Sequence, residues 1–186
     1  MIGRVMATAK TGTFYLTETI TLPASTAAGG RVQGTIDLGA YVNVPTGQAL
    51  AVDSVDFIWQ AGADFGQEVA GMVASNGALS CQLTDLNPGT SFVRADNQSL
   101  ISSGSMNIDQ PNSIATHVAD IYPDNFGKLN DAFMVVNDTL YLVAGNDATA
   151  ISTADVFLTA RVRCQVVKLS QENWMAIAIQ STASDN

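Results

Sequence analysis

At 186 residues, the chain has the length of one domain and enough residues to bury a hydrophobic core. Hydrophobic residues make up 47% of it, but charged residues only 13%, about half the roughly 25% typical of globular domains. The net charge of −9, from 17 acidic and 8 basic residues, argues against direct nucleic-acid binding through basic contacts, because neutralising phosphates takes Lys and Arg.

The uncharged polar residues Thr, Ser, Asn and Gln take the positions that charged residues occupy in most globular domains. Interface cores are depleted in charge, so we expect much of the surface to be covered by neighbouring chains. The alternative is a secreted β-protein with a neutral polar surface.

The first third of the chain alternates between apolar and polar residues, the pattern of half-buried strands. Strands are expected at Thr11 to Leu22, Arg31 to Leu38 and Gln48 to Gln60, with one helical turn at Ala40 to Asn43. The apolar phase of the third strand changes near Asp53-Ser54. One extra residue swaps the two faces of a strand, so this change predicts a β-bulge.

The middle of the chain gives a mixed signal. Asn76-Gly77 separates the apolar runs Val69 to Ser75 and Ala78 to Thr84. This pattern predicts a hairpin, because a tight hairpin turn needs positive φ at both of its central residues and Asn-Gly is the favoured pair there. Residues 97–112 have little periodicity and many turn formers, and are expected to form a long excursion. Shorter strands are expected at Ile114 to Tyr122, Phe133 to Val136 and Leu140 to Ala144.

The longest alternating stretch, Thr153 to Leu169, predicts a central strand with which other strands pair. Ser170 to Gln180 favours a short helix, with Ser170 as its N-cap. Eight to ten strands with frequent turns predict an all-β sandwich or barrel. We expect one domain over residues 1–186, with flexible termini at 1–11 and 181–186.

The start of the chain, MIGRVMATAKTG, lacks the apolar core of a signal peptide, so no export leader is expected. No run approaches the apolar length of a membrane span. Cys81 and Cys164 lie on the apolar phase of their strands and are expected to be buried thiols. A disulfide remains an alternative only if their strands are neighbours. The glycosylation patterns at Asn97-Gln98-Ser99 and Asn137-Asp138-Thr139 are expected to be chance matches without a leader.

The titratable residues offer two candidate arrangements for catalysis. His117 could act as a base, but no Gly-x-Ser-x-Gly motif accompanies it. Two sets of carboxylates could in principle meet in space as an acid–base pair: Asp53 with Asp56, and Asp120 with Asp124 and Asp131. Aspartates near turns more commonly form the turns themselves. We therefore expect no enzyme, no catalytic residues and no cofactor.

Two further features leave alternatives open. The acidic stretch Asp120 to Asp131 could bind calcium, but it lacks the spacing of an EF-hand loop, and we expect no metal site. Arg161 and Arg163 share the polar face of the central strand. They could pair with acidic residues of a neighbouring chain or with side chains of their own sheet.

Two stretches carry a resemblance to a known family: ETITLPASTAAGGRVQGTIDLGAYVNVPTGQALAVDSVDFIWQ at residues 18–60, and DVFLTARVRCQVVKLSQENWMAIAIQ at residues 155–180. They resemble the opening and closing strands of the small single jelly-roll major capsid proteins of tailless icosahedral viruses of archaea and bacteria that contain an internal membrane. The resemblance is one of pattern and covers somewhat over a third of the chain.

The resemblance implies an eight-stranded jelly-roll sandwich that serves as a capsid subunit. Copies of the chain would assemble with themselves, and with a larger second capsid protein, into capsomers of an icosahedral shell over a viral membrane. Such a protein would be assembled in the host cytoplasm and found in the virion. The family has no catalytic residues to carry over.

A carbohydrate-binding or glycan-processing β-sandwich is the alternative function. It predicts exposed aromatic side chains on one sheet face, with Trp59, Tyr41, Tyr122 or Trp174 as candidates. The aromatic fraction of 7% is low for this function, and Trp59 lies in phase with apolar residues of its strand. A subunit of a cell-surface or filament lattice is a third possibility.

Overall fold

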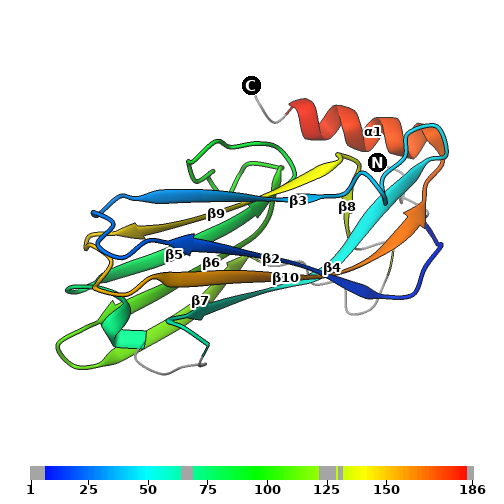
Figure 1. Ribbon diagram of the computed structural model, residues 1–186. Coiled ribbons are helices and arrows are strands. Elements are labelled where there is room, and N and C mark those ends of the chain that lie inside the picture. The colour runs from blue at the N-terminus through cyan, green and yellow to red at the C-terminus, as the bar shows by residue number, and fades with distance from the viewer. Residues whose placement is uncertain (1–6, 64–68, 122–128, 130–131, 184–186) are drawn as a thin grey trace.

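The computed structural model describes residues 7–63, 69–121, 129 and 132–183, which form two antiparallel β-sheets packed face to face with one α-helix beside them (Figure 1). The first sheet, sheet A, consists of β1 (Thr8–Ala9), β2 (Phe14–Leu22), β4 (Gln48–Gln60), β8 (Phe133–Val135) and β10 (Val156–Lys168). The second, sheet B, consists of β3 (Arg31–Asp37), β5 (Gly77–Thr84), β6 (Leu100–Asp109), β7 (Ile114–Ile121) and β9 (Thr139–Asp147). The helical elements are η1 (Val69–Met72) and α1 (Gln171–Ala183).

The strand order is that of a jelly roll. Sheet A contains β2, β10, β4 and β8 in this spatial order, and sheet B contains β3, β9, β5 and β6. The pairs β2–β10, β3–β9, β4–β8 and β5–β6 are all antiparallel, as expected when one long hairpin rolls up into two Greek keys. The predicted all-β jelly-roll sandwich with a short C-terminal helix is therefore confirmed. Two further strands, β1 and β7, extend the eight-stranded frame.

The central role predicted for the last long strand is also confirmed. β10 pairs with β2 along one edge and with β4 along the other, and its end also pairs with β1. Its inward side chains alternate along the strand and are all buried in the core between the sheets: Val156, Leu158, Ala160, Val162, Cys164 and Val166. β10 thus lies between β2 and β4 in sheet A and contributes a long apolar face to the core.

A β-bulge lies in β4 where the apolar phase changes. Arg163 lies opposite Ser54, but the next residue of β10, Cys164, lies opposite Val52. Asp53 is thus the extra residue, and it allows both Val52 and Val55 to face the core. The predicted bulge is confirmed.

The predicted hairpin at Asn76-Gly77 is wrong. The run before it forms η1 and a single bridge between Val73 and Ile151, while β5 pairs with β6 and β9. Gly77 does not have the positive φ that the predicted turn requires. It is needed for close packing, because a Cβ at this position would overlap Thr149 and lie 2.7 Å from the carbonyl oxygen of Asp147.

The excursion predicted over residues 97–112 is also wrong, because most of it is β6, a strand between β5 and β7. Its inward side chains Ile101, Met106 and Ile108 are buried. Between them lies a run of small residues, 102–105, that hides the alternation in the sequence. Gly104 in this run passes close to the opposite sheet, since a Cβ there would lie 3.2 Å from the Phe57 ring.

The C-terminal helix begins as predicted. The Ser170 hydroxyl accepts a hydrogen bond from the backbone N–H of Asn173 at 3.2 Å, which is an N-cap contact. Trp174 anchors α1 to the outer face of sheet A in a second small apolar cluster: Ala49, Ala51, Ala132, Met134, Val136, Val167 and Leu169. Within the described residues, no helix has the length and apolar character to cross a bilayer.

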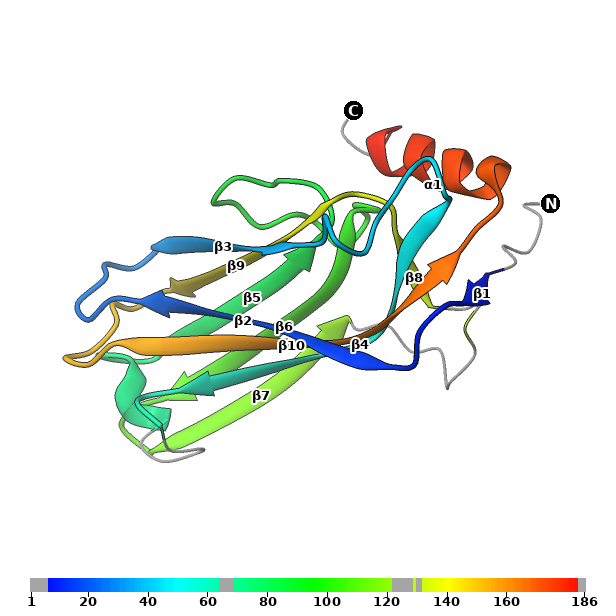
Figure 2. The ribbon, with the colours of Figure 1, turned by 45° about the vertical axis from the view of Figure 1, so that its right-hand side comes forward.

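The terminal stretches that were expected to be flexible include secondary structure. β1 lies within residues 1–11 and pairs with Val167 and Lys168 of β10 (Figure 2). The last turn of α1 lies within residues 181–186 and includes Ser181, which is buried.

Candidate functional site

Two of the residues considered for catalysis share a cavity between β4 and β7. His117 on β7 and Asp56 on β4 line an open cavity of about 460 Å³ together with Arg161 on β10. No hydrogen bond or ion pair among the described residues joins the His117 imidazole to Asp56 or Arg161. The only serine of this lining is Ser102, whose side chain is buried. The three polar side chains thus share a depression without forming a base–orienter pair.

The acidic stretch Asp120 to Asp131, which could bind calcium but was not expected to, lies mostly outside the described residues. Asp124 and Asp131 lie outside the described residues, as does the side chain of Asp120. Among the described side chains, no three His, Cys, Asp or Glu residues form a group that could hold a metal ion. Asp53, the other carboxylate considered for catalysis, lies at the bulge and faces Arg163 at 3.9 Å.

The two arginines of β10 make contacts within their own sheet. The Arg163 Nε lies 3.9 Å from Asp53 Oδ2, and the Arg161 guanidinium lies 4.8 Å from the centre of the Tyr15 ring. The structure thus contains cross-strand contacts of the kind expected as one of the two alternatives. Arg163 and Tyr15 are each about half exposed, so solvent weakens both contacts, whereas the Asp53 side chain is only 11% exposed.

The aromatic residues considered for glycan binding do not form an exposed platform. Trp59 belongs to the core, and Trp174 is buried beneath α1, where its Nε1 donates a hydrogen bond to the carbonyl oxygen of Gln48 at 3.3 Å. Tyr41 packs against Phe14 with ring centres 5.2 Å apart. Tyr122 lies outside the described residues.

Both cysteines are buried thiols, as predicted, and they belong to different sheets, Cys81 to β5 and Cys164 to β10. Burial raises the pKa of the Cys164 thiol to about 12, and the nearby Asp53 carboxylate adds to the effect. A thiol with so high a pKa is a poor nucleophile at neutral pH.

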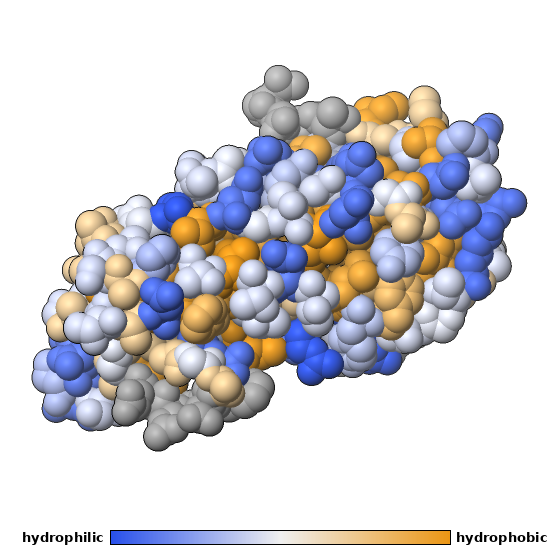
Figure 3. Space-filling view, viewed as in Figure 1, coloured by the Kyte–Doolittle hydropathy of each residue, from blue (hydrophilic) through white to orange (hydrophobic). Residues whose placement is uncertain are grey.

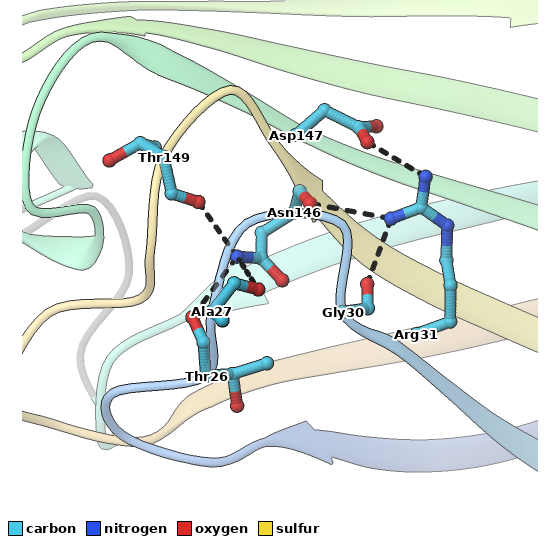
Figure 4. A network of polar contacts seen from close by, with 7 residues as sticks. All are labelled: Thr26, Ala27, Gly30, Arg31, Asn146, Asp147 and Thr149. Atoms are coloured by element: carbon cyan, nitrogen blue, oxygen red, sulfur yellow. Dashed lines mark hydrogen bonds and ion pairs between the residues drawn. The ribbon is translucent and has the colours of Figure 1, made fainter.

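A buried polar network that the sequence does not reveal holds one end of the sandwich together (Figure 4). Its centre is Asn146, which is fully buried near the end of β9. The Asn146 side-chain amide donates to the carbonyl oxygens of Thr26 at 3.3 Å, Ala27 at 3.0 Å and Thr149 at 2.8 Å. One side chain therefore ties the β2–β3 connection to the β9–β10 connection.

Arg31 completes this network from the first residue of β3. Its guanidinium donates to the carbonyl oxygens of Gly30 at 2.8 Å and Asn146 at 3.3 Å, and it pairs with Asp147 Oδ1 at 2.8 Å (Figure 4). The guanidinium also lies 4.5 Å from the centre of the Phe92 ring. Because Arg31 contacts the β2–β3 connection, the end of β9 and the β5–β6 connection at once, its role is to order this part of the fold.

A second buried polar group lies where α1 ends. Ser181 donates a hydrogen bond to Asp85 Oδ2 at 3.3 Å, and the Asn137 amide donates to the Ser181 oxygen at 3.3 Å and to the backbone oxygen of Asp85 at 3.0 Å. The other carboxyl oxygen of Asp85 is buried without a hydrogen-bond partner. Burial raises the pKa of Asp85 to about 6, although the hydrogen bond from Ser181 opposes the shift. The contact joins the helix to the loop after β5.

The outer surface carries several large apolar side chains. Six of them are exposed, and they are spread over strands, loops and the helix: Tyr15, Val44, Ile114, Val118, Met175 and Ile179. Met175 and Ile179 are one helical turn apart on α1, where apolar atoms reach the surface (Figure 3).

Comparisons with known proteins give no family. No family model matches the chain, and no curated protein matches it. Similar solved structures include Desmodium yellow mottle tymovirus (TM-score 0.35, 8% identity, covering 88% of this chain and 92% of that chain) and Cocksfoot mottle virus (TM-score 0.31, 12% identity, 91% and 90%). Dimeric latent PorU from Porphyromonas gingivalis is matched over 87% of this chain but 14% of its own, with TM-score 0.31 and 12% identity. These values are too low to support an argument about function.

Proposed function

We propose that this chain is a structural protein that assembles into a shell, specifically a major capsid subunit of an icosahedral virus. Its role in this proposal is to make contacts with other chains and not to catalyse a reaction. The whole of residues 1–186 serves as one jelly-roll capsid domain, located in the virion after assembly in the host cytoplasm.

The observation that carries this proposal is that large apolar side chains are exposed on a molecule with few charged residues. Tyr15, Ile114 and Met175 are each more than half exposed, yet they lie on three separate elements, β2, β7 and α1. Exposed apolar side chains on several sides of one molecule suit a subunit surrounded by neighbours. The jelly roll is a frame that viral shells use, although the fold by itself does not fix the function.

The partners in this proposal are other copies of the chain, a second capsid protein and an underlying viral membrane. A surface with few lysines and arginines suits a shell that does not touch its genome directly, because phosphates attract basic side chains. The glycan-binding alternative has no support from the described aromatic residues.

The test is sedimentation velocity of the purified full chain over a range of protein and salt concentrations, with negative-stain imaging of whatever pellets. The proposal expects discrete large species, either from the chain alone or after a second capsid protein is added, and flotation with lipid vesicles examines the membrane contact. A chain that stays monomeric in every one of these mixtures would refute the proposal.

A further inference from the structure

β7 has no counterpart in the facing sheet. Sheet B has five strands side by side, whereas the jelly-roll part of sheet A ends at the short β8 (Figure 2). The five residues from Ile114 to Val118 are therefore all exposed, including those on both faces of the strand. Ile114 is 55% exposed and Val118 is 41% exposed. An apolar strand with both faces in water is an unusual surface for an isolated molecule.

The first five residues of β7, Ile114 to Val118, lack the charged side chains and the bulge that usually protect an edge strand, since the β-bulge of β7 lies beyond them at Asp120. Within the part of the chain that the structure describes, β7 pairs with β6 alone, so its outward backbone N–H and C=O groups form an open ladder. Ile114–Ile121 contains no Lys, Arg or Pro, the residues that commonly block such pairing. The edge can therefore accept another strand.

The register with β6 shows which side chains of β7 point outward from the sandwich. His117 pairs with Met106, whose side chain is buried between the sheets, so His117 lies on the inner side of β7. Val118 pairs with Ser105 and lies on the outer side. Ile114 and Thr116 share this outer side, because alternate residues of a strand share a face.

We propose that two copies of this chain join through β7, with the two strands antiparallel and Thr116 on the two-fold axis, so that sheet B continues from one copy into the other. This contact specifies one interface of the proposed shell and so rests on the proposed function. Each Ile114 then lies opposite Val118 of the second copy, and the two Thr116 side chains lie opposite each other. On the inner side, Ala115 lies opposite His117.

The sequence of β7 suits a second copy better than a different partner. On its outer side the strand is nearly symmetric about Thr116, with the similar residues Ile114 and Val118 two positions away on either side. Antiparallel pairing about a two-fold axis brings each outward N–H opposite an outward C=O, which makes the edge complementary to itself. Apolar and Thr–Thr pairs directly across two strands are favourable.

The distribution of charge also favours a second copy of the chain as the partner of β7. The chain carries a net charge of −9, so two copies repel each other over most of their surfaces. Residues 110–118 contain no Asp, Glu, Lys or Arg. This strand is therefore a place where two acidic molecules can meet without bringing like charges together.

Disulfide trapping tests the register. The full-length Thr116→Cys variant is oxidised in dilute solution and run on a non-reducing gel, beside the matched variant Thr17→Cys, which puts a cysteine on the exposed face of β2. Cys81 and Cys164 are buried and provide the wild-type background. We expect a covalent dimer for Thr116→Cys at least tenfold more abundant than for Thr17→Cys. Equal amounts from the two variants, or no dimer from Thr116→Cys, would overturn the proposal.

A second variant tests the energetics without a new bond. Val118→Lys places a charge opposite Ile114 of the second copy and should weaken self-association at least tenfold in sedimentation velocity, whereas Thr17→Lys should leave it within twofold. Unchanged association of Val118→Lys would also overturn the proposal. If large particles form but Thr116→Cys is not trapped as a dimer, the shell function is supported and the β7 interface is refuted. If the dimer is trapped but no large particles form, the β7 interface is supported and the shell function is refuted.

Discussion

Replacement of the buried Asp85 carboxyl by a neutral amide should stabilise the protein at neutral pH. In the folded chain, Asp85 is 3% exposed, one of its carboxyl oxygens has no hydrogen-bond partner, and it lies at the C-terminal end of α1. Ionisation puts a negative charge in this site beside the negative end of the helix dipole. No charged side chain joins Asp85 among the described residues that line the adjoining cavity, so the Ser181 hydroxyl stabilises the charge there but no cation does.

The magnitude follows from linkage between protonation and folding. Burial raises the pKa of Asp85 from 3.8 to about 6, so the folded state holds its proton more tightly than the unfolded state. The contribution of Asp85 to stability is therefore fully present below about pH 4 and is lost as the pH rises through about 6. A difference of about two pKa units corresponds to roughly 3 kcal/mol in the free energy of unfolding.

Urea denaturation followed by tryptophan fluorescence at pH 4.5 and pH 7.5 measures this effect. Asp85→Asn should be more stable than the wild type at pH 7.5 by about 2–3 kcal/mol, with a much smaller difference at pH 4.5. The control Asp96→Asn changes a carboxylate that is 78% exposed and should behave like the wild type. If the difference in the free energy of unfolding between Asp85→Asn and the wild type is the same at both pH values, the reasoning is wrong.

Two substitutions and one labelling experiment test the packing. Asn146→Ala removes the donor to three backbone carbonyls and should lower the free energy of unfolding by roughly 3 kcal/mol in urea, whereas the exposed Asn107→Ala should change it little; equal effects would contradict the network. Ser170→Ala removes the helix N-cap and should cost about 1 kcal/mol in thermal unfolding, and a stability no lower than that of the wild type would remove the cap from the account. Cys81 and Cys164 should react with a thiol reagent at pH 8 only after denaturant is added, and full labelling of the native protein within minutes would contradict their burial.

Features encoded by neighbouring residues could be predicted from the sequence. The alternation over Thr153 to Leu169 marks β10 because a long apolar face must be buried, and the phase change at Asp53 marks the bulge because burial continues on both sides of it. Ser170 marks the start of α1 because capping is a local interaction.

Features that depend on distant residues could not be predicted. β6 was missed because its small residues pack against the opposite sheet, where the space beside Gly104 is limited by Phe57. Gly77 looked like a turn residue, but its lack of a side chain serves close packing on Thr149. Asp85 meets Ser181 across 96 positions of sequence, a contact that only the rolled-up topology creates.

The proposed function requires that this chain associates with other chains. The most direct measurement is the mass of the native full-length protein by sedimentation velocity, followed by negative-stain imaging of the fastest-sedimenting fraction. We predict species much heavier than the 19.5 kDa chain, ending in uniform closed particles once any required second capsid protein is present. A single 19.5 kDa species at every concentration and salt, also in the presence of candidate shell partners, would contradict the claim.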